Sequence, residues 1–202
     1  MDLFETMRLE DGIFKRIQFH TKRIQQSSRN LDINFNLEQW NQLLNRIAEE
    51  YPKGVYRVKI ILKQNGKFDS VIADLPDKAL FSAQLQKLPK NIPEAVLTNK
   101  TTNRAHLSHQ HLTDLILLYD ANGKILEFDI GNILIKEHDH FYTPTYNKDM
   151  LKGCMRQALI EQGNIYERDY DVDSFKEKYK QNEIQVYLIN SLREVADVKI
   201  YI

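Results

Sequence analysis

Several features that define common classes of protein are scarce in this sequence or missing from it. Its 202 residues contain one cysteine, Cys154, which excludes an internal disulfide framework and a cysteine-rich metal site. Only 7 glycines occur, and none belongs to a glycine-rich phosphate loop or a G-x-S-x-G motif. No apolar run approaches the roughly 18 residues that span a bilayer, and the N-terminus lacks the apolar stretch of a signal peptide. We therefore expect a cytoplasmic protein that has no membrane partner.

The sequence also has no excess charge of either sign. Its 28 basic and 28 acidic side chains give a formal net charge of zero. This balance provides no broad attraction to nucleic acid, so we expect no such partner, and it permits association between copies of the chain. Apolar residues make up 42% of the chain and charged residues 28%, as in ordinary globular proteins. The chain is long enough to bury a substantial core.

The first part of the chain alternates strand-like and helix-like patterns. Asn65-Gly66, between two runs rich in branched residues, is the strongest hairpin signal in the sequence. Asn36 precedes an amphipathic run and is a suitable helix N-cap. The patterns predict an α+β domain over residues 1–75, with a hairpin over 3–14, helices over 18–31 and 36–51, and strands over 55–62 and 70–73.

The second part of the chain is mostly strand-like. After a predicted linker at 76–79, the turn Asp120–Gly123 separates two apolar runs that we expect to pair. One helix is expected, beginning near Gly153. The prediction is a β-rich domain over residues 80–202, with strands at 115–119, 125–128, 132–136, 141–142, 185–189 and 198–202 and a helix over 151–162.

Six short patterns occur in one order along the chain. They are Leu3-Phe4-Glu5-Thr6-Met7, His20-x-x-Arg23, Lys100-x-x-Asn103-Arg104, Glu127-x(4)-Asn132, Thr143-Pro144 followed by Leu151-Lys152-Gly153-x-x-Arg156, and Asn190-Ser191-Leu192. This order resembles that of the class IV family of enzymes that depend on pyridoxal 5'-phosphate (PLP), which includes branched-chain and D-amino-acid aminotransferases and aminodeoxychorismate lyase. The resemblance runs from about Leu3 to the C-terminus.

The resemblance implies a particular fold and a choice of reactions. The fold is the two-domain PLP fold type IV, an α+β fold with an N-terminal α/β sandwich and a C-terminal β-rich pseudobarrel. PLP would lie in the cleft between the domains, and the protein would be a homodimer. The first reaction is that of 4-amino-4-deoxychorismate lyase, which releases pyruvate and leaves 4-aminobenzoate. The second is amino-acid transamination of the branched-chain or D-amino-acid type. A PLP-fold binding protein that has lost catalysis is the third alternative.

The resemblance also assigns two residues to the reactive part of the cofactor. A PLP enzyme needs a lysine amine that forms an imine with the cofactor aldehyde and then moves the substrate's α-proton. Lys100 matches the family's lysine. The cofactor ring accepts electrons best when its nitrogen is protonated, and a facing acid stabilises that charge. Glu127 matches the family's glutamate, and the nearby Asn132 matches an asparagine that we expect to support the local fold.

The cofactor phosphate needs positive charge and backbone donors, which a helix N-terminus supplies. Arg23 matches the arginine that reaches the phosphate in the family. Cys154 and Met155 open the expected helix and would offer backbone N–H groups, and Ser191 and Leu192 would form a second clamp. The family often has threonine at the position of Met155, so that hydroxyl contact is missing here.

The chain departs from the family pattern near its start and after Asn103, where it is short, as in a compact subgroup of bacterial class IV proteins. The substrate loops therefore do not align. Arg57 and Lys59 lie on one face of a predicted strand, where they can hold a substrate carboxylate or form a solvated row. The remaining histidines of the chain lack the spacing of a strong zinc-binding motif, so we expect no metal site. They are His106, His109, His111, His138 and His140.

Overall fold

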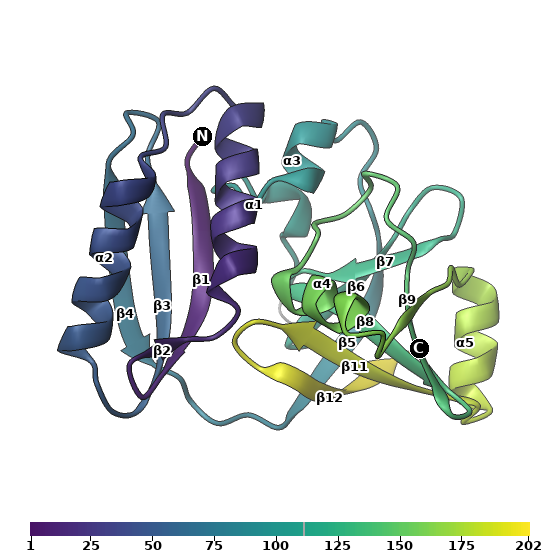
Figure 1. The fold of residues 1–202 in the computed structure, drawn as a ribbon. Helices are drawn as coiled ribbons and strands as arrows, with labels where there is room; N and C mark the ends of the chain where they lie inside the picture. Colours follow the sequence, from purple (N-terminus) through teal and green to yellow (C-terminus); the bar gives the residue numbers. More distant parts are fainter. Residues whose placement is uncertain (111) are drawn as a thin grey trace. The chain divides into compact units, whose positions relative to one another are not determined.

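The chain folds into two compact units, which a computed structural model describes for residues 1–110 and 112–202. The first unit comprises Met1–Asp77 together with Asn99–Asn103. The second comprises Lys78–Thr98 and Arg104–Ile202. The chain therefore returns briefly to the first unit after it has begun the second, and this short return carries Lys100 (Figure 1).

The first unit is a sheet covered on one face by two helices (Figure 1). Its core joins Ile24 and Trp40 on the helices to Met7 and Ile60 on the sheet. This arrangement confirms the expected α/β sandwich, in which each amphipathic helix buries its apolar stripe against the sheet. The strands, in the order β2-β1-β3-β4, are β1 (Leu3–Glu10), β2 (Ile13–Phe14), β3 (Val55–Leu62) and β4 (Phe68–Asp74), and the helices are α1 (Ile17–Asn30) and α2 (Leu37–Glu50).

The pairing of β1 with β3 decides which side chains face the helices. The two strands run antiparallel in unbroken register from Leu3 opposite Leu62 to Glu10 opposite Val55. Side chains alternate across a strand, so Glu5 lies on the same face as the core residue Met7, while Phe4 lies on the other face. An acid is therefore directed toward the helical side of the sheet.

The second unit is built on a mixed sheet that closes on itself. The strand order is β10-β9-β8-β11-β12-β5-β6-β7, and β7 also pairs with β8, which completes a ring. This closure confirms the expected β-rich pseudobarrel. The elements are β5 (Leu80–Lys87), α3 (Glu94–Thr98), η1 (Ala105–Leu107), β6 (Leu115–Tyr119), β7 (Ile125–Phe128), β8 (Gly131–Glu137), β9 (His140–Thr143), α4 (Cys154–Glu161), β10 (Tyr166–Glu167), α5 (Val172–Lys180), β11 (Ile184–Asn190) and β12 (Glu194–Tyr201).

The sequence analysis did not predict β5, α3, η1, β10 or α5 of the second unit, of which β5 and α5 are the longest. β5 lies between β12 and β6 and is parallel to both, and it buries Phe81 and Ala83. Its apolar residues alternate with Ser and Gln, a short period-2 pattern that is compatible with a strand, and both of its partner strands are distant in the sequence. Helix α5 does have a local signal, because the Asp171 carboxylate accepts hydrogen bonds from the Asp173 and Ser174 amides at its start.

Asn36 caps α2 as expected, and this contact yields a simple test of the fold. Its Oδ1 accepts the Gln39 amide at 3.0 Å. Asn36→Ala should lower the free energy of unfolding by about 1 kcal/mol, because it leaves that amide without its acceptor. Urea titration measures the change, and Asn36→Ser should retain most of the stability. An unchanged midpoint in Asn36→Ala would mean that water replaces the cap without cost.

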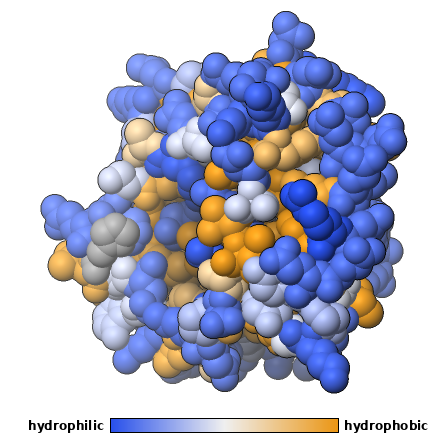
Figure 2. All heavy atoms as spheres, turned by 90° about the vertical axis from the view of Figure 1, so that its left-hand side faces the viewer, coloured by the Kyte–Doolittle hydropathy of each residue, from blue (hydrophilic) through white to orange (hydrophobic). Residues whose placement is uncertain are grey.

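The surface is mainly hydrophilic but includes exposed apolar side chains in both units. On the face drawn in Figure 2, hydrophilic residues surround a patch of apolar ones. Ile13 and Val71 are exposed in the first unit, and Leu80 and Tyr201 are exposed on neighbouring strands of the second. Among residues 1–110 and 112–202, no helix has both the length and the apolar character needed to cross a bilayer.

Candidate active site

Lys100 lies beside the first strand of the first unit. The Phe4 amide donates to the Lys100 carbonyl at 2.9 Å, and Leu3 and Thr101 form a β-bridge. The Thr102 amide donates to the Asp2 carbonyl, also at 2.9 Å. These contacts, among them a single isolated β-bridge, hold Asn99–Asn103 beside the start of β1. The Lys100 ammonium group lies 4.9 Å from the centroid of the Phe4 ring, at cation–π distance.

Arg23 is held by a buried carboxylate on β1. Its Nε donates to Glu5 Oε1 at 2.8 Å and its Nη2 donates to Glu5 Oε2 at 2.5 Å, which makes a bidentate ion pair. His20 Nδ1 lies 2.6 Å from the same Oε2. Arg23 and His20 lie one turn apart on α1, so a single helical face presents both to Glu5. A two-point contact fixes the plane of the guanidinium group as well as its position.

The charges of this triad follow from its burial. Burial opposes ionisation of Glu5, but the neighbouring Arg23 and His20 outweigh it and hold the pKa of Glu5 at about 2. Burial lowers the pKa of His20, and the adjacent Glu5 only partly offsets this effect. At neutral pH the triad therefore consists of the Glu5 carboxylate, the Arg23 guanidinium group and a neutral His20 imidazole. The Nδ1–H of His20 donates to Glu5.

The two tentative substrate residues lie on β3, where they differ in what they contact. Lys59 is half-buried, and its ammonium group lies 4.6 Å from the centroid of the Phe4 ring that Lys100 also contacts. Arg57 is exposed and pairs in register with Arg8 on β1. Only Lys59 is therefore brought close to Lys100, while Arg57 extends the row of positive charge along the same face of the strand.

Glu127 ends up in a dense polar network in the second unit. Its Oε1 accepts the Leu151 amide at 3.0 Å, and its Oε2 accepts Asn132 Nδ2 at 3.2 Å. The Asn132 side chain also donates to the Leu151 carbonyl at 2.9 Å and accepts the Gly153 amide at 3.0 Å. Both Glu127 oxygens are thereby connected to the segment that leads into α4.

The sequence predicts a helix that begins at Leu151, but α4 begins at Cys154. These contacts explain the difference. The Leu151 and Gly153 amides bond to side chains of β7 and β8, so these residues stay outside the helix. Cys154 and Met155 occupy the first turn of α4, where backbone amides precede the i to i−4 hydrogen-bonding pattern of a helix. A helix start of this kind supplies amide donors and a dipole that favour an anion.

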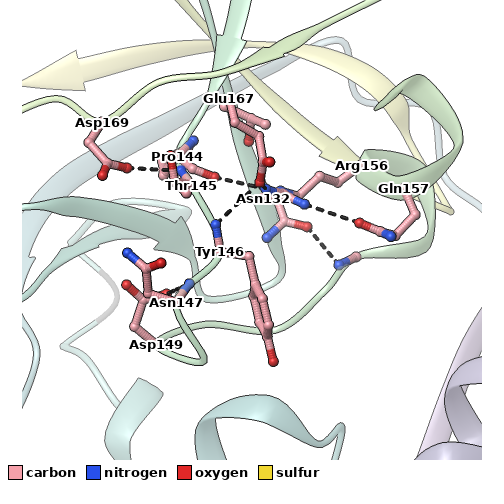
Figure 3. A network of polar contacts seen from close by, with 12 residues as sticks. Asn132, Pro144, Thr145, Tyr146, Asn147, Asp149, Arg156, Gln157, Glu167 and Asp169 are labelled. Carbon is pink, nitrogen blue, oxygen red and sulfur yellow. Dashed lines mark hydrogen bonds and ion pairs between the residues drawn. The ribbon is translucent and has the colours of Figure 1, made fainter. Parts of the chain in front are cut away.

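Arg156 holds the same turn from its other side (Figure 3). Its Nη2 donates to the Pro144 carbonyl at 2.8 Å and contacts the Glu167 carboxylate. Glu167 in turn accepts the Tyr146 amide at 3.2 Å. Arg156 is 1% exposed, so this network anchors the beginning of α4 to the loop after β9 rather than to solvent.

Ser191 and Leu192 lie in the turn between β11 and β12. Asn132 pairs in register with Ile189, so Ser191 follows closely on the strand residue that adjoins Asn132. Gly131 permits this approach, because a Cβ there would lie 2.7 Å from the Ile189 carbonyl oxygen. Ser191 is almost fully buried. The Leu192 amide donates to Asn190 Oδ1 at 3.0 Å, so an anion that used this amide would have to replace that acceptor.

Arg104, His109 and Asp129 form a second polar group near Glu127. Arg104 donates to the Asp129 carbonyl, and His109 Nε2 lies 3.6 Å from Asp129 Oδ2. Burial lowers the pKa of Arg104, while the negative charges of Glu127 and Asp129 oppose that shift. His109 is therefore engaged with a carboxylate, and His111 lies outside the described residues.

The groups in the two units fit PLP chemically. Lys100 offers an amine for the aldehyde, and Glu127 offers a carboxylate whose orientation two hydrogen bonds fix for the ring nitrogen. Arg23, whose guanidinium plane is fixed by Glu5, offers a cation for the phosphate. The start of α4 offers amide donors for it. Each set of residues is assembled within its own unit.

The family model described as "Amino-transferase class IV" matches residues 2–201, nearly the whole chain. The chain belongs to the class IV aminotransferase family. Its members depend on PLP, so this protein is a PLP-dependent enzyme. A Schizosaccharomyces pombe protein provisionally named aminodeoxychorismate lyase is 30% identical over 210 residues, covering 96% of this chain and 87% of the relative.

Solved structures of class IV proteins share the fold. A provisionally named amino-acid aminotransferase from Mesorhizobium loti superimposes with a TM-score of 0.84 at 22% identity, covering 99% of both chains. The PLP-bound form of a hypothetical aminotransferase from Mycobacterium tuberculosis has a TM-score of 0.81 at 18% identity, covering 98% of this chain and 81% of the other. Proteins named as a lyase and as an aminotransferase are thus both similar to this chain over nearly its whole length.

Three residues of the site have contacts that the sequence analysis did not anticipate. Glu5 lay within a recognised motif but had no assigned role, and its bidentate contact with Arg23 depends on the pairing of α1 with β1. Asn132 was expected only to support the local fold, yet it contacts both Glu127 and the segment before α4. Arg104 was noted as part of the lysine motif. An acid among the apolar residues Leu3, Phe4 and Met7 of a strand-like run was the available signal for Glu5.

Proposed function

We propose that this class IV enzyme is a 4-amino-4-deoxychorismate lyase, which releases pyruvate from its substrate and leaves 4-aminobenzoate. The observation that carries the proposal is the pair of ammonium groups of Lys59 and Lys100 over one Phe4 ring. The lyase substrate has an amine and two carboxylates, and Lys59 is suited to hold a carboxylate beside the reacting amine. The lyase name of the S. pombe relative supports the same assignment.

The proposed residue roles follow from the chemistry of each side chain. A bound PLP would supply an aldehyde for the substrate's amine and an electron-accepting ring for the bond that breaks. Lys100 Nζ carries the cofactor and then removes the proton from the carbon that bears the amine. The Glu127 carboxylate accepts a hydrogen bond from the protonated ring nitrogen, which stabilises its positive charge. Lys59, with Arg57 farther along β3, holds the substrate carboxylates.

The phosphate is assigned to five hydrogen-bond donors. Arg23 supplies the charge, and Glu5 orients it. The amides of Cys154 and Met155 and the hydroxyl of Ser191 donate hydrogen bonds. The amide of Leu192 joins them once a phosphate oxygen replaces Asn190 Oδ1. The thioether of Met155 adds no hydroxyl donor, so the backbone has a larger share of phosphate binding here than it would beside a threonine.

Product analysis of the PLP-loaded protein tests the proposed reaction. With aminodeoxychorismate as the only substrate, we expect equal amounts of pyruvate and 4-aminobenzoate without any amino acceptor. Adding a 2-oxo acid should leave that rate unchanged. Omission of PLP is the control. Release of pyruvate only when an acceptor is present, or no release at all, would reject the lyase assignment.

Amino-acid transamination is the second candidate. The M. loti chain named as an aminotransferase matches this chain over almost its full length, so a short chain does not favour the lyase. The two reactions use the same cofactor residues and differ in where the proton returns. Acceptor-dependent exchange between branched-chain or D-amino acids and 2-oxo acids would support this candidate. A purified protein that takes up no PLP would instead support the non-catalytic binding protein.

The proposal includes a homodimer and a cytoplasmic location. Exposed apolar side chains on adjacent strands of the second unit, among them Leu80, Val195 and Tyr201, are consistent with a contact between copies. Sedimentation should give twice the chain mass of 23.9 kDa. A single mass of 23.9 kDa at micromolar concentration would contradict the dimer.

A further inference from the structure

Asn132 connects two parts of the second unit that the proposed function treats separately. Its side chain is almost fully buried and makes three hydrogen bonds, to Glu127 Oε2, the Leu151 carbonyl and the Gly153 amide. Figure 3 shows Asn132 directed at the backbone that enters α4. One planar amide therefore contacts both the acid on β7 and the start of the helix.

Hydrogen bonds from Asn132 and Leu151 hold both oxygens of the Glu127 carboxylate. Oε2 accepts Asn132, and Oε1 accepts the Leu151 amide, whose own carbonyl accepts Asn132. The three groups thus form a closed ring of hydrogen bonds. A displacement of Leu151 would move Glu127, and a rotation of Asn132 would release both.

Close packing leaves no freedom at the helix side of this ring. A Cβ on Gly153 would lie 2.0 Å from Asn132 Oδ1, so only glycine fits opposite the amide. On the other side of the first turn, the buried Arg156 donates to the Pro144 carbonyl (Figure 3). The start of α4 is therefore fixed between Asn132 and Arg156, and Asn132 also contacts Glu127.

We propose that Asn132 is a positioning residue that sets the spacing between Glu127 and the first turn of α4 so that one rigid ligand engages both. This inference rests on the proposed function, in which Glu127 meets the PLP ring nitrogen and α4 meets the phosphate. The covalent frame of PLP fixes the separation of those two groups. A protein whose acid and phosphate donors are held at the matching separation loses less entropy on binding than one that must adjust either part.

The amide is the functional group that this position requires. It donates toward two oxygens and accepts from one N–H group, which no carboxylate or hydroxyl can do at once. Asn132→Asp keeps an acceptor for the Gly153 amide but sets a second carboxylate against Glu127 and the Leu151 carbonyl. Asn132→Ala removes all three contacts. The two variants therefore separate the helix contact from the acid contact.

The test compares whole cofactor with its fragments. Equilibrium binding of PLP, of phosphate-free pyridoxal and of inorganic phosphate is measured for the wild type, Asn132→Asp and Asn132→Ala. Asn164→Ala is the matched control, since this asparagine is exposed and its side chain donates to the nearby Gln162 side chain. We expect Asn132→Ala to weaken PLP binding about 10- to 100-fold, from the loss of its hydrogen bonds. Asn164→Ala should bind PLP like the wild type.

The decisive comparison is between the loss for PLP and the losses for its fragments. If Asn132 sets the spacing, the fold-loss for PLP exceeds the product of the fold-losses for pyridoxal and phosphate, because neither fragment requires the spacing. A loss for PLP equal to that product would overturn the inference and leave Asn132 as local support. Circular dichroism without cofactor verifies folding, and Asn132→Asp provides the comparison if Asn132→Ala does not fold. If the wild type itself binds no PLP, the proposed function fails first.

Discussion

Replacing Lys100 by alanine should abolish covalent attachment of PLP and, with it, the visible absorbance band that the wild-type protein develops when the cofactor is added. The amine of this side chain is the assigned partner of the cofactor aldehyde, and alanine has no nucleophile to replace it. The variant should still bind PLP noncovalently through the phosphate and ring contacts. Because Lys100 also moves the substrate proton, turnover should fall by about 10³-fold or more. Absorbance spectra and a pyruvate-release assay measure the two effects.

Lys59 provides a matched control, because its ammonium group contacts the same Phe4 ring as Lys100. Lys59→Ala should keep the absorbance band while losing affinity for carboxylate substrates. After borohydride reduction, peptide mapping should place the cofactor on the peptide that contains Lys100. A band that persists in Lys100→Ala and disappears in Lys59→Ala would transfer the assignment to Lys59. No band in the wild type would remove PLP from the proposal altogether.

The fold could be predicted from the sequence wherever a local signal determines local structure. Asn36 caps α2, and Asn65-Gly66 joins β3 to β4, because a cap and a tight turn depend on a few adjacent residues. The pairing of β5 could not be predicted in this way. This strand is paired on one side with β12, more than a hundred residues later in the chain, and on the other with β6. Its strand conformation is stabilised by partners that no local pattern identifies.

The candidate site shows the same division. The motif order named Lys100, Arg23 and Glu127 as cofactor residues, but it could not say what each one contacts. Glu5 and Arg23 are 18 residues apart, and their ion pair exists only because α1 packs on β1. Likewise, Asn132 reaches Gly153 because β8 runs beside the segment that enters α4. Contacts across such separations depend on tertiary packing, which a sequence motif does not describe.

Glu5→Gln should destabilise the protein by about 3 kcal/mol, since it leaves the largely buried Arg23 without its carboxylate. The glutamine can still accept one hydrogen bond, but it carries no charge and cannot pair with both Arg23 and His20 as an anion. The same substitution should weaken PLP binding, because the guanidinium assigned to the phosphate loses its bidentate anchor. Urea titration at pH 7 measures the stability, and equilibrium binding measures the second effect.

The contribution of Glu5 should depend on pH in a defined direction. Its pKa is lowered from the ordinary 4.5 to about 2 in the folded protein, against the opposing effect of burial, by Arg23 and His20. A group with a lowered folded pKa stabilises the protein above its unfolded pKa, and this stability is lost as the pH falls through the folded value. The full difference between wild type and Glu5→Gln should therefore be present above pH 4.5 and vanish near pH 2. The lowering corresponds to about 3 kcal/mol, in agreement with the expected loss.

Glu10 on the same strand is the matched control for this prediction. It pairs with Arg8 at 3.2 Å and with Lys15 at 3.4 Å, but at the surface, where water screens the charges. Glu10→Gln should therefore change the urea midpoint little at any pH, although the pKa of Glu10 is also lowered by its basic partners. Other carboxylates titrate equally in all three proteins, so their effects cancel in the differences. If Glu5→Gln were no less stable than Glu10→Gln at pH 7, the buried ion pair would contribute no more than a surface one, and Arg23 would need another explanation for its fixed orientation.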